Sequence, residues 1–383
     1  MKEIKNLKKA AKRIKKAIKK KEKIILYGDA DLDGVASVII LKEAIKNLGS
    51  NIIAIYFPDR ETEGYGITEK GLDYLKKFAP ALLITLDLGI GNFQEVKLAK
   101  KLGFEVIIID HHEILDRIPE AKIVVDPKQK GDKYPFKGFA TAGIAFKLAE
   151  LLLERNLPES IRRGFLELVA LSTIADMMPR ENENAILINE GLSFLENSWR
   201  PGLRAFLETE AFNHYLNLNQ KISKIISLLN IRDVEDNLPA SFRLLDSSSV
   251  EESKKLIERL IEKSKARSQN IAKIVEVIEE RISKKESPII FEGDTSWEFT
   301  LISSVASIFC QKYQKPSFIF KILEKESQGT VRTPAGLDSV ALMKKCKKYL
   351  ITYGGHPQAS GFRIKNENLE KFRECLIKNL CEK

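Results

Sequence analysis

The sequence predicts an α/β protein in which a domain built on a parallel sheet is joined by a long helical connector to a smaller α/β domain. Short apolar runs alternate with helix-like stretches in the first half of the chain, which is the pattern of βαβ units. A second region of this kind follows a stretch that contains no Gly or Pro. The length of 383 residues also exceeds that of a typical single domain. We therefore expect two domains and a connector.

The positive charge of the chain is concentrated at its beginning. Residues 1–23 contain twelve Lys or Arg against two Glu, which accounts for the whole net charge of +10. Apolar residues recur there with the spacing of an amphipathic helix: Ile4, Leu7, Ala11, Ile14 and Ile18. Two interpretations stay open. The helix packs on the body with its lysines in water, or the lysines contact the phosphates of a nucleic acid.

Five apolar runs after this segment are predicted to be strands. Each is rich in Ile, Val or Leu and is bounded by Gly, Asp or Pro. The runs occupy residues 24–27, 52–57, 81–86, 106–109 and 123–125. Helix-like stretches between them imply right-handed crossovers, and therefore a mostly parallel sheet.

The rest of the chain is predicted in less detail. Residues 139–195 are expected to be mainly helical, and residues 196–245 give mixed signals. Residues 249–286 are rich in Glu, Lys, Arg and Ile, which predicts a long, exposed helix. The second α/β region begins at Pro288. It contains apolar runs near Ile289, Phe299 and Phe318, a helix near 303–313 and a glycine-rich turn at Gly354-Gly355.

Cysteine usage and the lengths of the apolar runs restrict the class of protein. The four cysteines include no CxxC pair, so neither a disulfide framework nor a zinc site is expected. They are Cys310, Cys346, Cys375 and Cys381. No run of about 18 apolar residues is present, so no membrane-spanning helix is expected. Sparse cysteines without an export signal favour the cytoplasm.

Polar clusters follow three of the five predicted strands. The first strand is followed by Gly-Asp-Ala-Asp-Leu-Asp-Gly at 28–34, the third by Asp87, and the fourth by the triplet Asp110-His111-His112. In an open α/β sheet, ligands bind outside the carboxyl ends of the strands. We therefore expect the three clusters to meet at one edge of the sheet.

Gathered carboxylates repel one another unless a cation neutralises them. Carboxylate oxygens suit Mg²⁺ or Mn²⁺, and two such ions can polarise a phosphoryl group and activate water. A single Asp after a strand is more often a helix N-cap. The Asp-rich run also resembles a calcium loop, although the glutamate of such a loop is absent. Three clusters on one edge favour the metal site.

These clusters resemble the DHH phosphoesterase superfamily, and within it the chain is most similar to RecJ-type single-strand exonucleases. Further motifs occur in the same order: Arg60 with EGYG at 63–66, TLDLGI at 85–90, DHHE at 110–113, VDPKQ at 125–129, YPFKG at 134–138, TAGIAFKL at 141–148 and LVALSTIAD at 168–176. GGHPQASG at 354–361 resembles the hallmark of the DHHA1 domain. The resemblance covers roughly residues 22–195 and 286–375.

The resemblance implies roles for the residues at the matching positions. It implies two metal ions, Mn²⁺ or Mg²⁺, held by Asp29, Asp31, Asp33, Asp87, His111 and Asp176, with Asp29 either a ligand or an acid behind the ligands. The catalytic triplet would be Asp110, His111 and His112, with His112 beside the scissile phosphate as an electrophile or a proton donor. Substrate phosphates would be bound in the second domain by Gly354, Gly355, His356 and Arg332.

The implied organisation has four segments and a cleft between the two domains. The segments are a basic amphipathic helix at 1–23, a DHH catalytic domain at 24–195, a helical region with the connector helix at 196–285, and a DHHA1 substrate-binding domain at 286–383. Three features depart from bacterial RecJ. Tyr27 stands where a His is common, SWEFT at 296–300 replaces a His-Pro-Gly stretch, and the oligonucleotide-binding fold is not expected.

The implied function is metal-dependent hydrolysis of single-stranded nucleic acid, with single-stranded DNA digested in the 5′ to 3′ direction as the expected reaction. One alternative is a phosphodiesterase for short oligoribonucleotides or cyclic dinucleotides. Another is a non-catalytic replication factor that binds the GINS complex, although such relatives have typically lost the acidic ligands that this chain keeps. Expected partners are single-stranded DNA or RNA and replication or repair proteins such as GINS, and no membrane.

Overall fold

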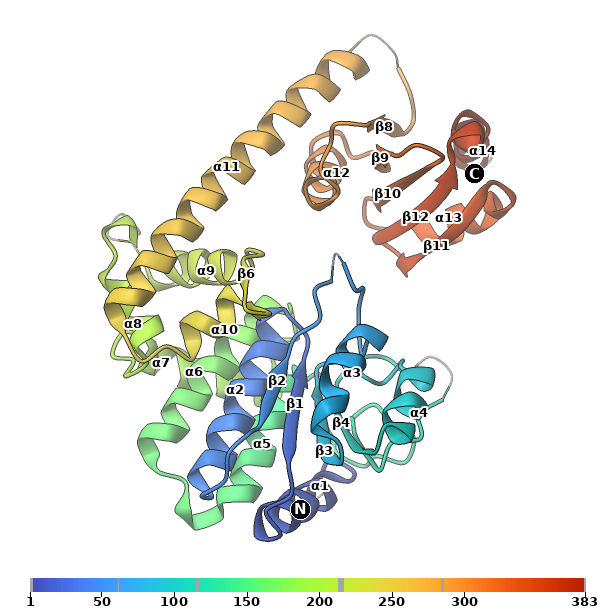
Figure 1. The fold of residues 1–383 in the computed structure, drawn as a ribbon. Helices are drawn as coiled ribbons and strands as arrows, with labels where there is room; N and C mark the ends of the chain where they lie inside the picture. The colour runs from blue at the N-terminus through green and yellow to red at the C-terminus, as the bar shows by residue number, and fades with distance from the viewer. Residues whose placement is uncertain (1–2, 61, 115–116, 213–216, 284–285, 382–383) are drawn as a thin grey trace. The chain divides into compact units, whose positions relative to one another are not determined.

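The computed structural model describes residues 3–60, 62–114, 117–212, 217–283 and 286–381. The chain forms two compact units, Met1–Ile261 and Glu262–Lys383. The unit boundary lies inside α11 (Val250–Ile282), a helix of 33 residues that confirms the long helix predicted from composition (Figure 1). The bounds of the four predicted segments stay a prediction.

The first unit is built on a five-stranded sheet in which every neighbouring pair is parallel, as predicted. The strand order is β2-β1-β3-β4-β5. The strands are β1 (Ile24–Gly28), β2 (Ala54–Tyr56), β3 (Ala81–Leu86), β4 (Phe104–Ile109) and β5 (Ile123–Val125). All residues of β1 and β3 are buried, because helices cover both faces of the sheet.

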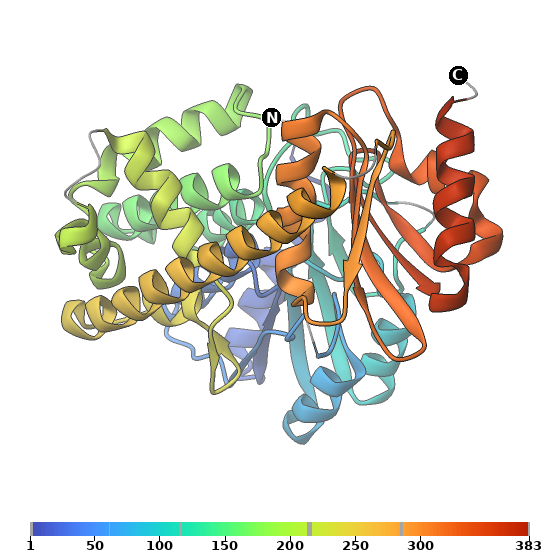
Figure 2. The same cartoon turned by 90° about the horizontal axis from the view of Figure 1, so that it is seen from above.

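Alternate residues of the central strand point into two separate cores. Ile24 and Leu26 pack with one set of helices, whereas Ile25 and Tyr27 pack with the other. The first set is α2 (Leu32–Asn47), α5 (Thr141–Leu153), α6 (Glu159–Ala175) and α7 (Asn182–Leu195), and the second is α3 (Glu69–Leu75) and α4 (Phe93–Lys101). Figures 1 and 2 show helices on the two sides of this sheet. Short 3₁₀ turns occupy Lys76–Phe78 and Glu154–Asn156.

The described residues of the stretch 196–245, where the sequence gave mixed signals, form a helical subregion of the first unit. Leu203, Phe206, Ile225 and Leu244 from this stretch are all buried in the core that contains α2 and α6. Its elements are α8 (Pro201–Glu208), η3 (Glu210–Phe212), α9 (Leu218–Leu229), the hairpin β6 (Val234–Glu235) and β7 (Leu238–Pro239), and α10 (Ala240–Leu245).

The basic N-terminal segment forms helix α1 (Leu7–Lys19), as predicted. Its apolar side is buried, with Ile14 fully inaccessible and Leu7 only 4% exposed. The helix packs against α5 and β5. The prediction that this helix packs on the body is therefore confirmed. The role of its lysines is a separate question.

The second unit is a mixed sheet covered by helices. The strand order is β11-β12-β10-β9-β8, with β8 parallel to β9 and the other pairs antiparallel. Its elements are β8 (Ile290–Asp294), α12 (Phe299–Tyr313), β9 (Ser317–Ile322), β10 (Glu326–Arg332), α13 (Ser339–Lys345), η4 (Lys347–Tyr349), β11 (Leu350–His356), β12 (Ala359–Lys365), η5 (Asn366–Asn368) and α14 (Leu369–Cys381).

The helix predicted near 303–313 is present and begins earlier, at the apolar run near Phe299. One local prediction for this unit is wrong. Gly354 and Gly355 do not form a turn. They lie in β11 and pair with Gly361 and Ser360 of β12, and the turn comes after them.

Cys346 and Cys375 form a disulfide, a single bond that the sequence pattern did not predict. The bond joins the end of α13 to α14. The two cysteines are 29 residues apart, and this spacing gave no recognisable pattern in the sequence. Cys310 is free and buried. The cytoplasmic location stays a prediction. None of the helices among the described residues has the length and apolarity that crossing a membrane requires.

Candidate active site

Three loops at the carboxyl ends of β1, β3 and β4 bring the predicted site residues together. These strands are neighbours in the sheet, so their last residues end side by side. The main chain continues the ladder beyond the strands, because the N–H of Asp29 donates to Leu86 O at 3.1 Å and that of Asp87 to Ile109 O at 3.0 Å. The first acid of each loop is therefore fixed by the sheet itself.

The aspartates of the first loop are held in two different ways. Asp31 is the N-cap of α2, where its Oδ1 accepts hydrogen bonds from the N–H groups of Asp33 and Gly34, each at 3.1 Å. Asp33 accepts instead from the N–H groups of Thr141 at 2.6 Å and Ala142 at 2.9 Å. These two donors are the unpaired N–H groups at the start of α5. The N-cap interpretation thus holds for Asp31, and a distant helix orients Asp33.

The ring of His111 presents its Nε2 atom to three acids. Nδ1 lies 2.9 Å from Phe139 O, a carbonyl that only accepts, so Nδ1 carries the proton and Nε2 the lone pair. Nε2 lies 3.4 Å from both Asp87 Oδ1 and Asp176 Oδ2, and 3.9 Å from Asp33 Oδ2. Within the described part of the chain, Nε2 and Asp176 Oδ2 are buried without a hydrogen-bond partner. A cation would satisfy both atoms.

Among the described residues there are three sets of side chains that could hold a metal ion. Within each set, the potential ligand atoms lie within 4.8 Å of one another. The sets are Asp33, His111 and Asp176; Asp87, His111 and His112; and Asp29, Asp31 and Asp87. Asp87 and His111 each belong to two of the sets, so the three sets form one connected cluster. Carboxylates with one or two imidazoles suit Mn²⁺ or Mg²⁺. The residues present therefore fit divalent metal.

The electrostatics of the cluster point the same way. Burial and the charges of neighbouring acids raise the pKa of Asp33 to about 7 and that of Asp176 to about 6. The same causes raise the pKa of Asp87 well above its usual range. Burial lowers the pKa of His111 to about 4, which keeps its imidazole neutral, as a metal ligand must be. The side chains of the protein thus do not fully compensate the negative charge of Asp33, Asp87 and Asp176.

His112 is oriented by Asp110. Asp110 is fully buried, and its Oδ1 lies 2.8 Å from His112 Nδ1 while its Oδ2 accepts from the N–H of Ile90 at 3.0 Å. Burial would raise the pKa of Asp110, but the hydrogen bond and charge of His112 together with the N–H groups of Ile90 and His112 outweigh it and lower that pKa. The same hydrogen bond raises the pKa of His112 to about 9. The His112 side chain is half exposed.

Arg60 contacts both carboxylate oxygens of Asp29 and one of Asp31. Its Nε lies 2.8 Å from Asp29 Oδ1, and its Nη2 lies 2.6 Å from Asp29 Oδ2 and 2.7 Å from Asp31 Oδ2. Burial raises the pKa of Asp29, with Arg60 opposing, whereas Arg60 outweighs the effect of burial on Asp31 and lowers its pKa. This geometry favours Asp29 as an acid behind the ligands.

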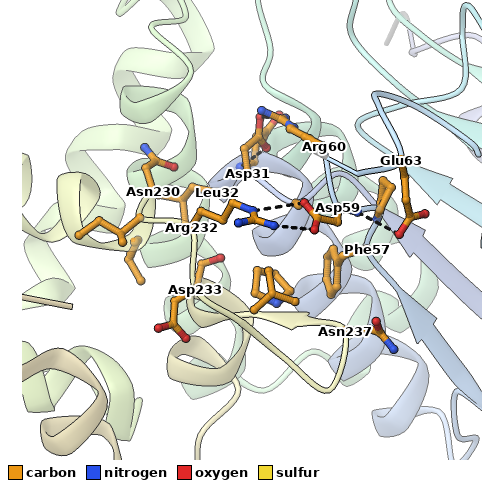
Figure 3. Close-up of a pocket in the computed structure, with 18 of the residues that line it drawn as sticks. Asp31, Leu32, Phe57, Asp59, Arg60, Glu63, Asn230, Arg232, Asp233 and Asn237 are labelled. Atoms are coloured by element: carbon orange, nitrogen blue, oxygen red, sulfur yellow. Dashed lines mark hydrogen bonds and ion pairs between the residues drawn. The ribbon is translucent and has the colours of Figure 1, made fainter. Parts of the chain in front are cut away.

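A pocket of about 410 Å³ opens beside the acids. Figure 3 shows Asp31 and Arg60 on one side, with Asn230 and Arg232 opposite them. Arg232 is held toward the pocket by an ion pair with Asp59 at 2.6 Å. Sequence reasoning missed Asn230 and Arg232, because residues 196–245 received no prediction. The available signal was the polar group at 230–233, which ends the apolar pattern of α9.

The glycines of the second unit differ in their structural need. A Cβ at Gly354 would meet nothing within 4 Å. At Gly355, with φ at +130°, a Cβ would come within 2.6 Å of Ala359 O. Glycine at 355 is therefore required by the hairpin itself, whereas Gly354 is exposed and free of that constraint. His356 ends β11, and its side chain lies outside the described part of the structure.

Arg332 is engaged within its own unit. Its guanidinium donates to Ser303 Oγ at 2.6 Å and to Thr330 Oγ1 at 3.0 Å, and burial lowers its pKa. These contacts provide a structural role, so substrate binding by Arg332 stays a prediction.

The chain matches known families in both units. Residues 23–173 match the DHH family, N-terminal domain, and residues 286–382 match the DHHA1 domain. The chain therefore contains a DHH-family domain followed by a DHHA1 domain. In this DHH protein, the family triplet is the Asp110-His111-His112 cluster described above. The resemblance and the fold class predicted from the sequence are both confirmed.

This DHH protein is similar to the single-stranded-DNA-specific exonuclease RecJ of Bacillus subtilis, with 33% identity over 98% of the chain and 48% of the relative. RecJ of Thermus thermophilus is 30% identical over 94% of the chain and 52% of the relative. The chain thus spans about half the length of these two relatives. A solved structure of exonuclease RecJ bound to manganese has a TM-score of 0.80 and 26% identity, and covers 99% of this chain and 95% of that one.

Proposed function

We propose that this protein is a metal-dependent phosphodiesterase that digests single-stranded nucleic acid from one end, as its RecJ relatives are named for doing. The convergence of the unpartnered His111 Nε2 with the carboxylates of Asp87 and Asp176 carries this proposal. A buried arrangement of this kind is costly without a cation. The manganese in a solved RecJ structure of similar fold gives independent support.

Two divalent ions, Mn²⁺ or Mg²⁺, would be held by the clustered acids and His111. The residues that would hold them are Asp31, Asp33, Asp87, His111 and Asp176, whose potential ligand atoms lie close together. When bound, the ions would neutralise charge on the phosphoryl oxygens and activate a water molecule. The hydrogen bond from Thr141 Oγ1 to Asp87 Oδ1, at 3.0 Å, would keep that carboxylate oriented within the cluster.

His112 would act on the phosphate rather than hold a metal. Asp110 fixes its Nδ1, which leaves the exposed Nε2 edge to donate a hydrogen bond to a non-bridging or leaving oxygen. Asp110 and His112 thus form a pair in which the buried carboxylate positions the exposed imidazole as a donor.

The pocket beside the acids would receive a nucleotide unit of the substrate. Its volume of about 410 Å³ lies in the range of small-ligand sites. Arg60, Lys70 and Arg232 line it together with acids that include Asp31, Asp33 and Asp176. Bound metal ions would be needed to offset those acids and bring a phosphate near Asp31.

The expected substrate is single-stranded DNA digested in the 5′ to 3′ direction, with the glycines of β11 and His356 as further phosphate contacts in the second unit. The retained acids argue against a purely non-catalytic factor. Binding to proteins such as GINS stays a prediction from the resemblance.

The test is digestion of DNA and RNA strands of several lengths, labelled at either end, in the presence of Mn²⁺. The proposal expects stepwise release of nucleotides from single strands and no reaction after chelation. Preferred cleavage of dinucleotides with long strands untouched would favour the short-oligonucleotide or cyclic-dinucleotide alternative. Failure to cleave even a p-nitrophenyl phosphodiester with Mn²⁺ would favour a non-catalytic role.

A further inference from the structure

Helix α1 has an apolar side and a basic side, and the structure shows where each one faces. The apolar side is buried against α5 and β5 through Leu7, Ala10 and Ile14. The opposite side carries exposed lysines at positions 8, 9, 12, 16 and 19, which fall on one stripe at the 3.6-residue period. From Lys8 to Lys19 this stripe runs for about 17 Å.

Only part of the basic charge of α1 is used inside the protein. Arg13 pairs with Glu105 and Glu22, and Lys15 pairs with Glu154. Lys8 pairs with Glu3. Within the described part of the chain, no ion pair joins an acid to Lys9, Lys12, Lys16 or Lys19, and residues beyond this segment sum to zero charge. The stripe is therefore a local positive patch on an otherwise balanced protein.

The middle of the stripe lies away from the metal ligands. Arg13 reaches Glu22, just before β1, and Glu105, at the start of β4, so the middle of α1 lies at the amino ends of these strands. The acids follow the carboxyl ends of the same strands. Strand β1, with five residues, separates the two ends by about 17 Å. Figure 1 shows α1 at the base of β1.

We infer that the lysine stripe of α1 is a second nucleic-acid-binding surface, which holds the sugar–phosphate backbone of a strand at a distance from the metal cluster. The charge complementarity is direct, since evenly spaced lysines meet a chain of phosphates. A row of flexible ammonium groups without aromatic side chains fits phosphate contact without base readout. This surface adds grip on long strands and goes beyond hydrolysis.

Binding measured in EDTA tests this inference independently of the proposed function, since no metal-dependent cleavage is involved. The full chain and the variant Lys9→Gln/Lys12→Gln/Lys16→Gln are titrated with a long single-stranded DNA over a series of salt concentrations. Loss of three phosphate contacts should lower the slope of log affinity against log salt by about 2. Replacement of the same lysines by Arg should preserve the slope, because phosphate contact needs the charge.

The matched control removes the same charge elsewhere in the first unit. Lys97, Lys100 and Lys101 at the end of α4 are exposed, and their triple replacement by Gln should leave the slope unchanged. An unchanged slope in the α1 variant would overturn the inference, as would an equal loss in the control. Polyglutamate that competes as well as DNA of equal charge would also overturn it, in favour of an acidic protein partner.

Discussion

At the scale of single residues, Asp87 combines a structural and a chemical constraint. Its φ of +65° is in the left-handed region, where Asn and Asp are tolerated far better than Ala. Asp87→Asn keeps this backbone and can still accept the hydrogen bond from Thr141. It removes one negative charge from the acid cluster, so we expect loss of nuclease activity with little change in melting temperature.

The control for this variant is Asp132→Asn. Asp132 is an equally inaccessible carboxylate that pairs with Lys137 and lies outside the acid cluster. Its replacement should leave turnover on single-stranded DNA near the wild-type value. Normal activity in a folded Asp87→Asn protein would contradict the assignment of Asp87 as a metal ligand.

Glu167 provides a pH prediction away from the metal site. Burial raises its pKa to about 7, although Ser198 Oγ donates to it at 2.8 Å. In the unfolded chain the pKa is about 4.3. The folded state therefore binds more protons between these values, and the free energy of unfolding falls as pH rises from about 4.3 to 7.

Glu167→Gln removes this titration. Relative to the wild type, the variant should gain stability between pH 5 and pH 8, because the buried carboxylate no longer has to ionise. Melting temperatures of both proteins at the two pH values measure the effect. A difference that stays constant with pH would show that Glu167 titrates normally.

At the scale of elements, helix α1 shows how one segment can serve packing and binding with opposite faces. Ile14 is fully buried, so Ile14→Ala should lower the free energy of unfolding by about 2–5 kcal/mol. Lys12→Gln on the exposed face should change it by less than about 0.5 kcal/mol. Denaturant unfolding measures both. The salt dependence of DNA binding should change in Lys12→Gln and stay the same in Ile14→Ala. A changed salt dependence in a folded Ile14→Ala protein would contradict the assignment of packing and binding to opposite faces.

At the scale of the whole molecule, metal binding should be visible as stability. An ion that binds only the folded state raises the free energy of unfolding by about 2.7 kcal/mol when its concentration is 100 times its Kd. We expect Mn²⁺ to raise the melting temperature of the chain and EDTA to reverse the effect. The rise should be smaller in Asp87→Asn and unchanged in Asp132→Asn. Equal rises in all three proteins would place the ion elsewhere.

The sequence by itself determined the order of strands and helices in the first unit, because the period of apolar residues is a local property. It also predicted that the acids at 29–33, Asp87 and the 110–112 triplet meet, because parallel strands end at a common edge. The individual elements within residues 196–245 and the Cys346–Cys375 bond escaped prediction, since the signals in the first were mixed and the second follows no local pattern.

Only the tertiary structure decided how each acid is used. The N–H groups of α5 orient Asp33 from 108 residues further along the chain. Phe139 O selects the tautomer that aims His111 Nε2 at the acids. Arg60 forms an ion pair with Asp29, and residues 230–233 help to line the pocket. Each of these contacts joins atoms that are distant in sequence and close only after the core has packed, so no local pattern of residues encodes them.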